Sequence, residues 1–405
     1  MTPHYDAIVV GARCAGSPTA MLLARSGHRV LAVDKATFPS DTLSTHFIHP
    51  PGVASLKRWG LLDEVRASNC PPIPRSVLGL GDLRLEAAPP PVDGITDAYC
   101  VRRTVLDDIL VRAAAASGAE VRQGFSVESL EFDGTRVTGL RGHGPDGVSV
   151  TERARVVIGA DGIHSHVARA VGSPSYDEHP TLTCAYYSYW SGVELDGAEL
   201  YPLPGRMIIA APTNDDQIFT IVYWPAAEFA QVRGDVEASF MTALDLVPGL
   251  AERVRAGTRT ERFRGTGHLP NFFRRSYGDG WALVGDAGYH KDPILALGIT
   301  DAFRDAELLA AALDAGFAGR EPTERAMAAY EQRRNAAAAQ SYANTIQFAS
   351  LEPPPPEMGE LMAALAADQD AASQFMGTVI GTVPAETFFA PENLARIIGK
   401  AVPRG

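Results

Sequence analysis

Residues 5–34 read YDAIVVGARCAGSPTAMLLARSGHRVLAVD. The first six residues are an apolar run of strand length, and a helical pattern follows from Gly16 to about Gly27. A second apolar run ends at Asp34. A strand, a glycine turn, a helix and a second strand within about 30 residues form the context in which a dinucleotide-binding turn occurs. This stretch therefore predicts the start of a Rossmann-like domain.

The turn departs from the G-x-G-x-x-G pattern, because Arg13 occupies the position of the second glycine. Gly11 permits the tight turn, and Gly16 permits close packing of the helix on the strand. The start of the helix suits a pyrophosphate, and the carboxylate of Asp34 suits ribose hydroxyls. An ordinary strand-to-helix turn explains the same residues. We expect Arg13 to point away from the turn and to lie beside the phosphates or the adenosine ribose, adding positive charge, or else to extend into solvent.

Two later stretches share this character. Residues 156–170 read VVIGADGIHSHVARA, and residues 281–309 read WALVGDAGYHKDPILALGITDAFRDAELL. In the first stretch a strand runs into Asp161, for which a helix-capping role is the simpler explanation. In the second stretch Asp286 follows a strand, where its carboxylate suits a polyhydroxyl chain. The helix that begins near Gly298 presents its N-terminus to negative charge on a bound ring.

The overall composition excludes several classes of protein. The length of 405 residues suits two domains, or one domain with a large insertion. A formal net charge of −12, without a dense run of lysine and arginine, argues against a nucleic-acid partner. No apolar run is long enough for a membrane span and no signal peptide is apparent, so we expect a cytoplasmic protein. The four scattered cysteines and ten histidines predict free thiols and no metal site.

The middle of the chain differs from both ends. From about residue 176 to 270, aromatic and β-branched segments alternate with turns, which predicts an inserted antiparallel sheet. The predicted fold class is α/β, with a Rossmann-like domain, this inserted antiparallel-sheet domain and a helical C-terminal region. The Rossmann-like domain would comprise residues 1–75, 99–175 and 271–345, the sheet domain residues 76–98 and 176–270, and the helical tail residues 346–405.

In this order and at these separations, the three motifs resemble those of FAD-dependent monooxygenases of the para-hydroxybenzoate hydroxylase type, the group A flavoprotein monooxygenases. The resemblance covers about residues 5–345. It implies that Asp286 binds the ribitol of FAD, that Asp161 lies near FAD and the nicotinamide nucleotide, and that Arg103 approaches the FAD phosphates. The implied cofactor-binding residues are Gly11, Arg13, Ala15, Gly16, Asp34, Lys35, Ser44, Thr45, Arg103, Asp161, Gly285, Asp286, Pro293, Gly298 and Ile299.

Some positions depart from the pattern of these monooxygenases. Arg13 replaces a glycine, Ala296 stands where glycine is frequent, and Thr300 stands where asparagine is common. These departures indicate a particular subgroup of these monooxygenases rather than loss of the cofactor, because Pro293 and Gly298 still match the pattern. Ser44, Thr45 and His46 fall in a loop that either approaches the flavin or lies in solvent.

The resemblance also implies a reaction. NADPH or NADH, bound transiently across a surface groove, reduces the flavin, and dioxygen adds to give a C4a-hydroperoxide. The distal oxygen then passes to an electron-rich substrate, which we expect to be an apolar, aromatic or polyketide-like small molecule. Backbone N–H groups around Leu297–Ile299 would stabilise charge at the N1–C2=O end of the flavin. The enzyme would act as a monomer or a homodimer.

The inserted sheet would roof the substrate pocket, although alternation along a strand lets only some of its aromatic side chains point inward. The substrate-binding candidates are Tyr186, Tyr189, Trp190, Tyr201, Trp224 and Leu295. If the reaction uses a general base, His46 and His290 are the histidines nearest in sequence to the flavin motifs. A structural or solvent role is the simpler explanation for both histidines, and Tyr289 and Asp292 are comparable candidates.

Three alternatives share this framework. Flavoproteins of the geranylgeranyl-reductase type, which the chain also resembles, would use the same FAD to reduce an alkene. Flavin-dependent halogenases also share this framework, but the sequence lacks their W-x-W-x-I-P signature and a matching lysine. A flavin-binding sensor without turnover is the third alternative.

Overall fold

A parallel sheet forms the centre of the protein, whose computed structural model describes residues 4–81, 83–353 and 356–401. The parallel strands run in the order β20–β10–β1–β2–β7. Their bounds are β1 (His4–Val10), β2 (Val30–Asp34), β7 (Glu120–Gln123), β10 (Ser149–Gly159) and β20 (Trp281–Leu283). The chain leaves β1 towards β2 on one side and reaches β10 on the other. A crevice at the carboxyl ends of these strands is where open α/β sheets bind their ligands.

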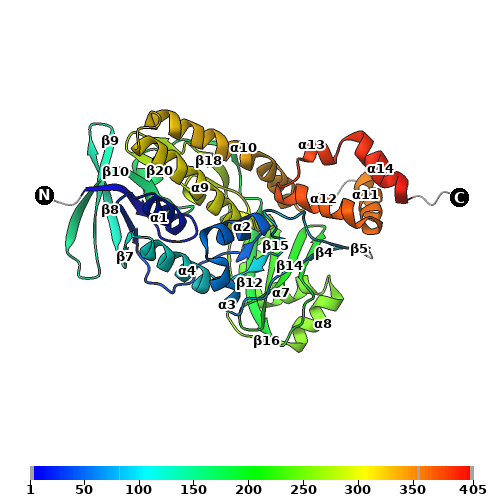
Figure 1. Ribbon diagram of the computed structural model, residues 1–405. Coiled ribbons are helices and arrows are strands. Elements are labelled where there is room, and N and C mark those ends of the chain that lie inside the picture. The colour runs from blue at the N-terminus through cyan, green and yellow to red at the C-terminus, as the bar shows by residue number, and fades with distance from the viewer. Residues whose placement is uncertain (1–3, 82, 354–355, 402–405) are drawn as a thin grey trace.

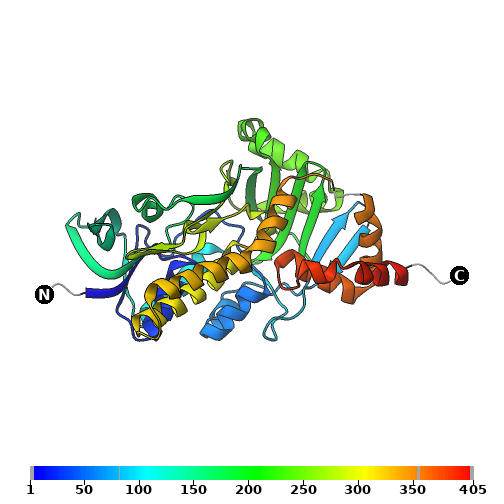
Figure 2. The ribbon, with the colours of Figure 1, turned by 90° about the horizontal axis from the view of Figure 1, so that it is seen from above.

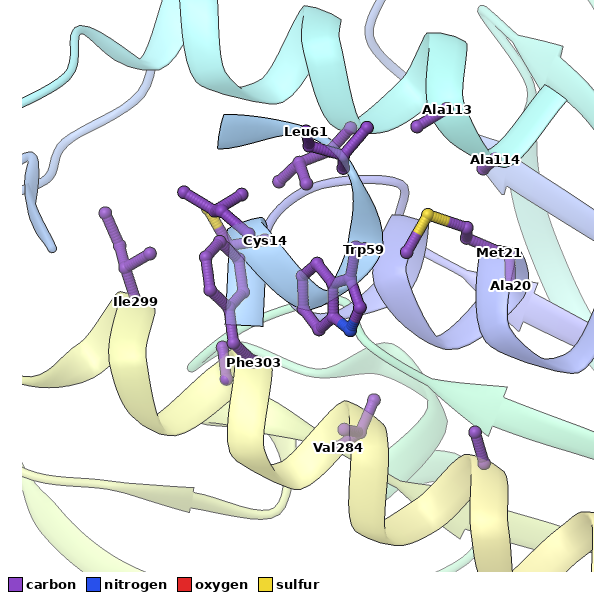
Figure 3. Packing of buried hydrophobic residues seen from close by; sticks show 14 of the residues in the cluster. Cys14, Ala20, Met21, Trp59, Leu61, Ala113, Ala114, Val284, Ile299 and Phe303 are labelled. Atoms are coloured by element: carbon purple, nitrogen blue, oxygen red, sulfur yellow. The ribbon is translucent and has the colours of Figure 1, made fainter. Parts of the chain in front are cut away.

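Helices cover one face of this sheet (Figure 1). They are α1 (Gly16–Arg25), α2 (Pro50–Trp59), α3 (Leu62–Ala67), α4 (Arg103–Ala116) and α9 (Gly298–Phe317). Their apolar faces form one buried core with the sheet. Figure 3 shows Phe303 of α9 directed towards Trp59 of α2, with ring centroids 5.0 Å apart. Because α1 also packs on α9, the glycine turn and the start of α9 belong to one rigid core.

The opposite face of the sheet carries an antiparallel arm. Strands β8 (Ser126–Asp133) and β9 (Arg136–His143) pair with each other, and β9 pairs with the first half of β10. The arm lies at the left of Figure 1, next to the N-terminus. Its apolar residues pack on those of β1 and β2 that point away from the helices. The short helix α5 (His166–Ala170) follows β10, and β19 (Tyr277–Gly278) pairs with β20.

A second, largely antiparallel sheet lies beside the first domain. Its order is β16–β12–β15–β14–β13–β4–β5, and β17 also pairs with β12. The bounds are β4 (Ser76–Leu80), β5 (Leu83–Ala87), β12 (Thr183–Ser191), β13 (Ala198–Leu203), β14 (Arg206–Thr213), β15 (Gln217–Pro225), β16 (Thr258–Arg259) and β17 (Arg264–Thr266). The outer face packs against α6 (Phe229–Gly234), α7 (Val236–Leu244) and α8 (Pro248–Ala256). The inner face packs against the residues that precede α9.

Two small sheets complete the fold. One pairs β3 (Phe47–Ile48) with β6 (Tyr99–Cys100). The other has three strands, in which β18 (Asn271–Arg274) lies between β11 (Ser175–His179) and β21 (Tyr289–His290). Single-turn 3₁₀ helices span Ala226–Glu228, Gly285–Ala287 and Pro293–Leu295.

The C-terminal region is helical. Helix α10 (Thr323–Ala349) packs along α9 and crosses the molecule to the second sheet (Figure 2). Helices α11 (Pro356–Ala367), α12 (Gln369–Ile380), α13 (Ala385–Phe388) and α14 (Pro391–Ala401) follow. They share a core with β4 and β5. The predicted fold class is thus confirmed. Within the described ranges, no helix combines the length and apolarity that a membrane span requires.

Candidate active site

The three sequence motifs meet at the carboxyl ends of the parallel strands. A Cβ atom on Gly11 would lie 2.4 Å from the Ala160 carbonyl oxygen, and one on Gly285 would lie 2.8 Å from the Cβ of Ala15. A Cβ on Gly16 would lie 1.7 Å from the carbonyl oxygen of Gly11. Gly11 and Gly285 also have φ values of +98° and +61°, which favour glycine. The close approach of three backbone segments therefore requires glycine at these positions.

Asp34 supports the glycine turn directly. Its Oδ2 accepts a hydrogen bond from the Ala12 N–H at 2.7 Å, and its Oδ1 accepts one from the Ala36 N–H at 2.8 Å. The side chain is buried, whereas that of the adjacent Lys35 is exposed. The carboxylate at the end of β2 therefore fixes the backbone of the turn and lies at the position predicted for a ribose contact.

Arg13 lies in an ion-pair network rather than free beside the turn. Its Nη1 donates to Asp107 Oδ2 at 2.6 Å, and its Nη2 donates to Ser40 Oγ at 2.9 Å. The guanidinium lies 5.2 Å from the ring centre of Phe38. Asp107 is fully buried and also binds Arg103 through two hydrogen bonds of 3.0 Å. The single carboxylate of Asp107 pairs with both Arg13 and Arg103, so the two guanidinium groups keep one net positive charge, and a contact of Arg13 with the phosphates stays a prediction.

Asp107 was not predicted to have a role, although it is the aspartate of the R-x-x-L-D stretch that contains Arg103. Its Oδ1 also lies 3.3 Å from the Cys14 Sγ. One carboxylate thus connects the glycine turn to the first turn of α4. Burial lowers the pKa of Arg103, but Asp107 and the more distant Asp286 outweigh burial, and the pKa is raised. Arg103 therefore stays charged between the first and third motifs.

The two other motif aspartates differ in their surroundings. The carboxylate of Asp161 accepts hydrogen bonds from Ser165 Oγ at 2.5 Å and from the His166 N–H at 2.6 Å, so it caps α5. This agrees with the capping explanation of Asp161, while its predicted place near FAD and the nicotinamide nucleotide stays a prediction. Asp286, in contrast, is exposed beside the buried Gly285. Its carboxylate lies where the third motif opens to the crevice.

The turn before α9 ends in an open helix N-terminus. Ala296 has a φ of +53°, and Gly298, the first residue of α9, is exposed. A Cβ on Gly298 would meet no atom within 4 Å. The first N–H groups of a helix lack partners within it, and the open space beside Gly298 leaves room for a ligand at this N-terminus. Pro293 begins the preceding 3₁₀ turn, and the side chain of Ile299 is buried in the helical core.

Two residues hold this turn in place, and neither was among the predicted site residues. His49 Nε2 lies 3.0 Å from the Leu295 carbonyl oxygen, and the His49 N–H donates to Thr300 Oγ1 at 3.1 Å. The Tyr223 hydroxyl donates to the Pro293 carbonyl oxygen at 3.0 Å. Burial lowers the pKa of His49 to about 4, so the ring is neutral at pH 7. His49 lies outside every motif, so the sequence did not predict its role. Its partner Thr300 was noted only because asparagine is common at that position.

His46 is buried in this arrangement. Its Nε2 lies 2.7 Å from the Tyr189 hydroxyl, and its ring packs edge-on against Phe219, with centroids 5.3 Å apart. Ser44 Oγ accepts the His46 N–H at 3.0 Å, while Thr45 precedes it in the same loop. Burial, followed by the charges of Arg103 and Arg102, holds the pKa of His46 well below its usual range. The His46 Nδ1 has no hydrogen-bond partner among the described residues, so the structural and the general-base interpretation of His46 both stay predictions.

The other candidate bases are also engaged in packing. His290 Nδ1 is hydrogen-bonded to the Pro270 carbonyl oxygen. The ring of Tyr289 stacks on Phe273 at a centroid distance of 5.1 Å. Asp292 Oδ2 accepts the Thr183 hydroxyl at 2.6 Å, and burial raises the pKa of Asp292 to about 6. Each of these side chains supports the junction of β18, β21 and the second sheet.

The aromatic candidates of the second sheet divide by strand alternation. Tyr189 points to the inner face, where it shares a core with Leu295. The other four pack against α6–α8 on the outer face, which corrects their assignment to the pocket: Tyr186, Trp190, Tyr201 and Trp224. The inner face instead carries Tyr187, Phe219 and Tyr223, which were not predicted. Alternation was known, but the sequence alone did not show which register faces the first domain.

Comparison with known proteins agrees with this geometry. The model of the FAD binding domain family matches residues 4–345. Digeranylgeranylglycerophospholipid reductase 1 from Methanopyrus kandleri is 29% identical, with 74% of this chain and 77% of that protein aligned. The 6-methylpretetramide 4-monooxygenase of Streptomyces rimosus is 28% identical, with 82% and 80% aligned. Across the first three curated relatives, the chain covers 66% to 77% of their length.

The fold extends to solved structures. The flavin-dependent brominase Bmp2 superposes with a TM-score of 0.82 and covers 98% of this chain and 99% of its own. At 20% identity, this likeness concerns the fold alone. Its coverage includes the helical tail, which lies beyond the residues that the family model matches.

Proposed function

This chain belongs to the FAD binding domain family, and we propose that it is a flavin-dependent monooxygenase. It would use FAD, NADPH or NADH, and dioxygen to oxygenate an apolar, aromatic small molecule. The observation that carries this proposal is the closed aromatic face of the second sheet against the turn that precedes α9. Such a face would exclude water beside the predicted flavin ring.

The described residues fit FAD. Gly11 and Gly16 lie against the backbone of Ala160 and of Gly11, and Gly285 lies against the side chain of Ala15. This packing supports a pyrophosphate at the N-terminus of α1. Asp34 would face the adenosine ribose, and the exposed Asp286 would face the ribitol. The open N-terminus of α9 at Gly298 suits the electron-rich end of the flavin ring.

FAD, when bound, supplies the electron transfer and the activation of dioxygen that side chains do not provide. The residues of this chain bind, orient and shield. Asp107 keeps Arg103 in place near Asp286, and the first N–H groups of α9 offer hydrogen bonds to developing negative charge. Tyr189, Phe219 and Leu295 exclude water from the inner face. No side chain of this cluster needs to act as a base.

The substrate class follows from the same face. Tyr187, Tyr189, Phe219 and Tyr223 present ring faces and edges, which select for flat, apolar molecules. One relative is named as a monooxygenase that acts on 6-methylpretetramide, which agrees with an oxygenation reaction. The hydroxyls of Tyr189 and Tyr223 are engaged by His46 and by the Pro293 carbonyl oxygen. The buried Tyr187 hydroxyl has no hydrogen-bond partner among the described residues, so it would suit one polar group on an otherwise apolar substrate.

An alternative is reduction of an alkene, because geranylgeranyl-reductase-type proteins are relatives of similar identity. Stopped-flow mixing of the reduced enzyme with dioxygen separates the two reactions. A monooxygenase should show a transient absorbance band, distinct from oxidised and reduced flavin, that an aromatic ligand alters. Slow reoxidation in a single phase, with or without ligand, would contradict oxygenation. Anaerobic reoxidation by an isoprenoid alkene would favour the reductase.

A flavin-binding sensor is distinguished by a steady-state assay. Purified holoprotein is mixed with NADPH or NADH and a panel of planar aromatic compounds, and oxidation of the nicotinamide is followed. An enzyme should accelerate this oxidation with at least one compound. Stable FAD binding without any oxidation would favour the sensor instead.

A further inference from the structure

We propose that His49 is a positioning residue for the flavin ring. It would hold the turn before α9 so that the first N–H groups of the helix face the pyrimidine end of FAD. This inference rests on the proposed function. His49 lies between β3 and α2, far in sequence from the turn that it contacts.

His49 contacts the turn on both sides of its exposed glycine. The side chain donates through Nε2 to the Leu295 carbonyl oxygen, three residues before Gly298. The backbone N–H donates to Thr300 Oγ1, two residues after Gly298. One residue thus contacts the backbone before the exposed glycine and a side chain after it. No other residue in the described part of the chain makes hydrogen bonds to both the Leu295 carbonyl oxygen and Thr300 Oγ1.

The approach of α2 to α9 shows how closely this contact is built. A Cβ atom on Gly52 would lie 2.9 Å from Thr300 Oγ1 and 2.8 Å from the side chain of Ile48. The start of α2 therefore sits directly against the first turn of α9, and it carries His49 with it. The ring of His49 also packs on Phe47, with centroids 4.8 Å apart.

The turn needs such an external support. Ala296 occupies the left-handed region with a φ of +53°, a conformation that persists only where surrounding contacts impose it. The N-cap position, Leu297, provides no side-chain cap for α9. The bond from Tyr223 to Pro293 holds the beginning of the turn, and His49 holds its end. Because the pKa of His49 is lowered, the ring acts as a neutral donor rather than as a charge.

The expected consequence is a difference in affinity between two forms of the flavin. Reduced FAD carries more negative charge at its pyrimidine end than oxidised FAD does. Correctly aimed N–H groups at a helix N-terminus stabilise that charge. When the turn is no longer held, the reduced form should lose more binding than the oxidised form.

The experiment uses full-length holoprotein and measures the FAD midpoint potential, the visible spectrum and the thermal midpoint. His49→Phe keeps a ring but removes the donor, whereas His49→Gln keeps a side-chain N–H. Thr300→Ala and Thr300→Ser form the second pair and change the turn more gently. The matched control is His28→Phe, because His28 contacts the other end of α9 through Asp314 at 2.8 Å.

We expect His49→Phe to weaken binding of reduced relative to oxidised FAD by about tenfold. For a two-electron couple, tenfold corresponds to a potential lower by about 30 mV. Thr300→Ala should shift the potential in the same direction, and His49→Gln and Thr300→Ser should restore most of the wild-type value. His28→Phe should lower the thermal midpoint without moving the potential.

Two results would overturn the proposal. One is a potential unchanged in both His49→Phe and Thr300→Ala while their thermal midpoints fall as in the control. The other is an equal shift in His49→Phe and His49→Gln, since the hydrogen bond would then be irrelevant. If wild-type protein binds no FAD, the proposed function itself fails, and that result is distinct from both.

Discussion

Replacement of Asp107 by asparagine should destabilise the apoprotein more than any surface charge substitution. Asp107 is fully buried, and the side chains of its partners Arg13 and Arg103 are only 23% and 10% exposed. Removing one member of a buried ion pair costs about 3–5 kcal/mol. Because the amide oxygen of asparagine still accepts one hydrogen bond, we expect about 3 kcal/mol. With an unfolding entropy of about 2.1 cal/mol/K per residue, this lowers the Tm by roughly 3–4 °C.

The assay is thermal and urea unfolding of apoprotein, with FAD affinity measured in parallel. Asp108→Asn is the matched control, because Asp108 is the next residue and pairs with the exposed Arg112 at 2.9 Å. Such a surface pair contributes at most about 0.5 kcal/mol. Equal losses in the two variants would refute the reasoning. A stable Asp107→Asn protein with tighter FAD binding would show that Arg13 serves the phosphates instead.

Three other perturbations have distinct expected outcomes. Gly285→Ala would bring a Cβ to 2.8 Å from Ala15 at a φ of +61°, so FAD binding, measured by flavin fluorescence, should weaken at least about tenfold in a protein that still folds. Tyr189→Phe removes the 2.7 Å bond to His46 and should cost about 1 kcal/mol in urea unfolding, whereas Tyr186→Phe on the outer face should cost less than half of that. The pKa of His49 is lowered from its ordinary value of 6.5 to about 4 in the folded protein. Between pH 6.5 and about pH 4 the unfolded chain therefore binds more protons than the folded chain, so the free energy of unfolding should fall as the pH drops through this window. In His49→Gln the fall should be shallower, and an unchanged slope would contradict this assignment.

The sequence was a good guide wherever backbone geometry dictated the residue. Gly11, Gly16 and Gly285 sit where an added Cβ would lie too close to neighbouring atoms, and the three motifs together, rather than one turn, indicated the fold. The family match over residues 4–345 confirmed the classification that these motifs suggested.

The sequence was a poor guide wherever one of two equivalent arrangements had to be chosen. Period-two alternation in β12 fits either face, and only the packing of α7 and α8 decides that Trp190 points outward. Asp107 and His49 act through contacts with residues 94 and 246 positions away, which no local pattern records. The ion pair of Arg13 was not predicted for the same reason, because Arg13 lies in the turn before α1 and its counter-ion Asp107 lies on α4.

The helices that follow α10 have a consequence for how the protein is made. Strand β5 is the last strand in its sheet, and Gln369, 283 residues later, donates to the Glu86 carbonyl oxygen at 2.9 Å. Leu85 and Ala87 share a core with Leu361 and Phe375. During synthesis, β5 therefore lacks these packing partners until α11 and α12 have left the ribosome. An uncovered edge strand of this kind can pair with another chain.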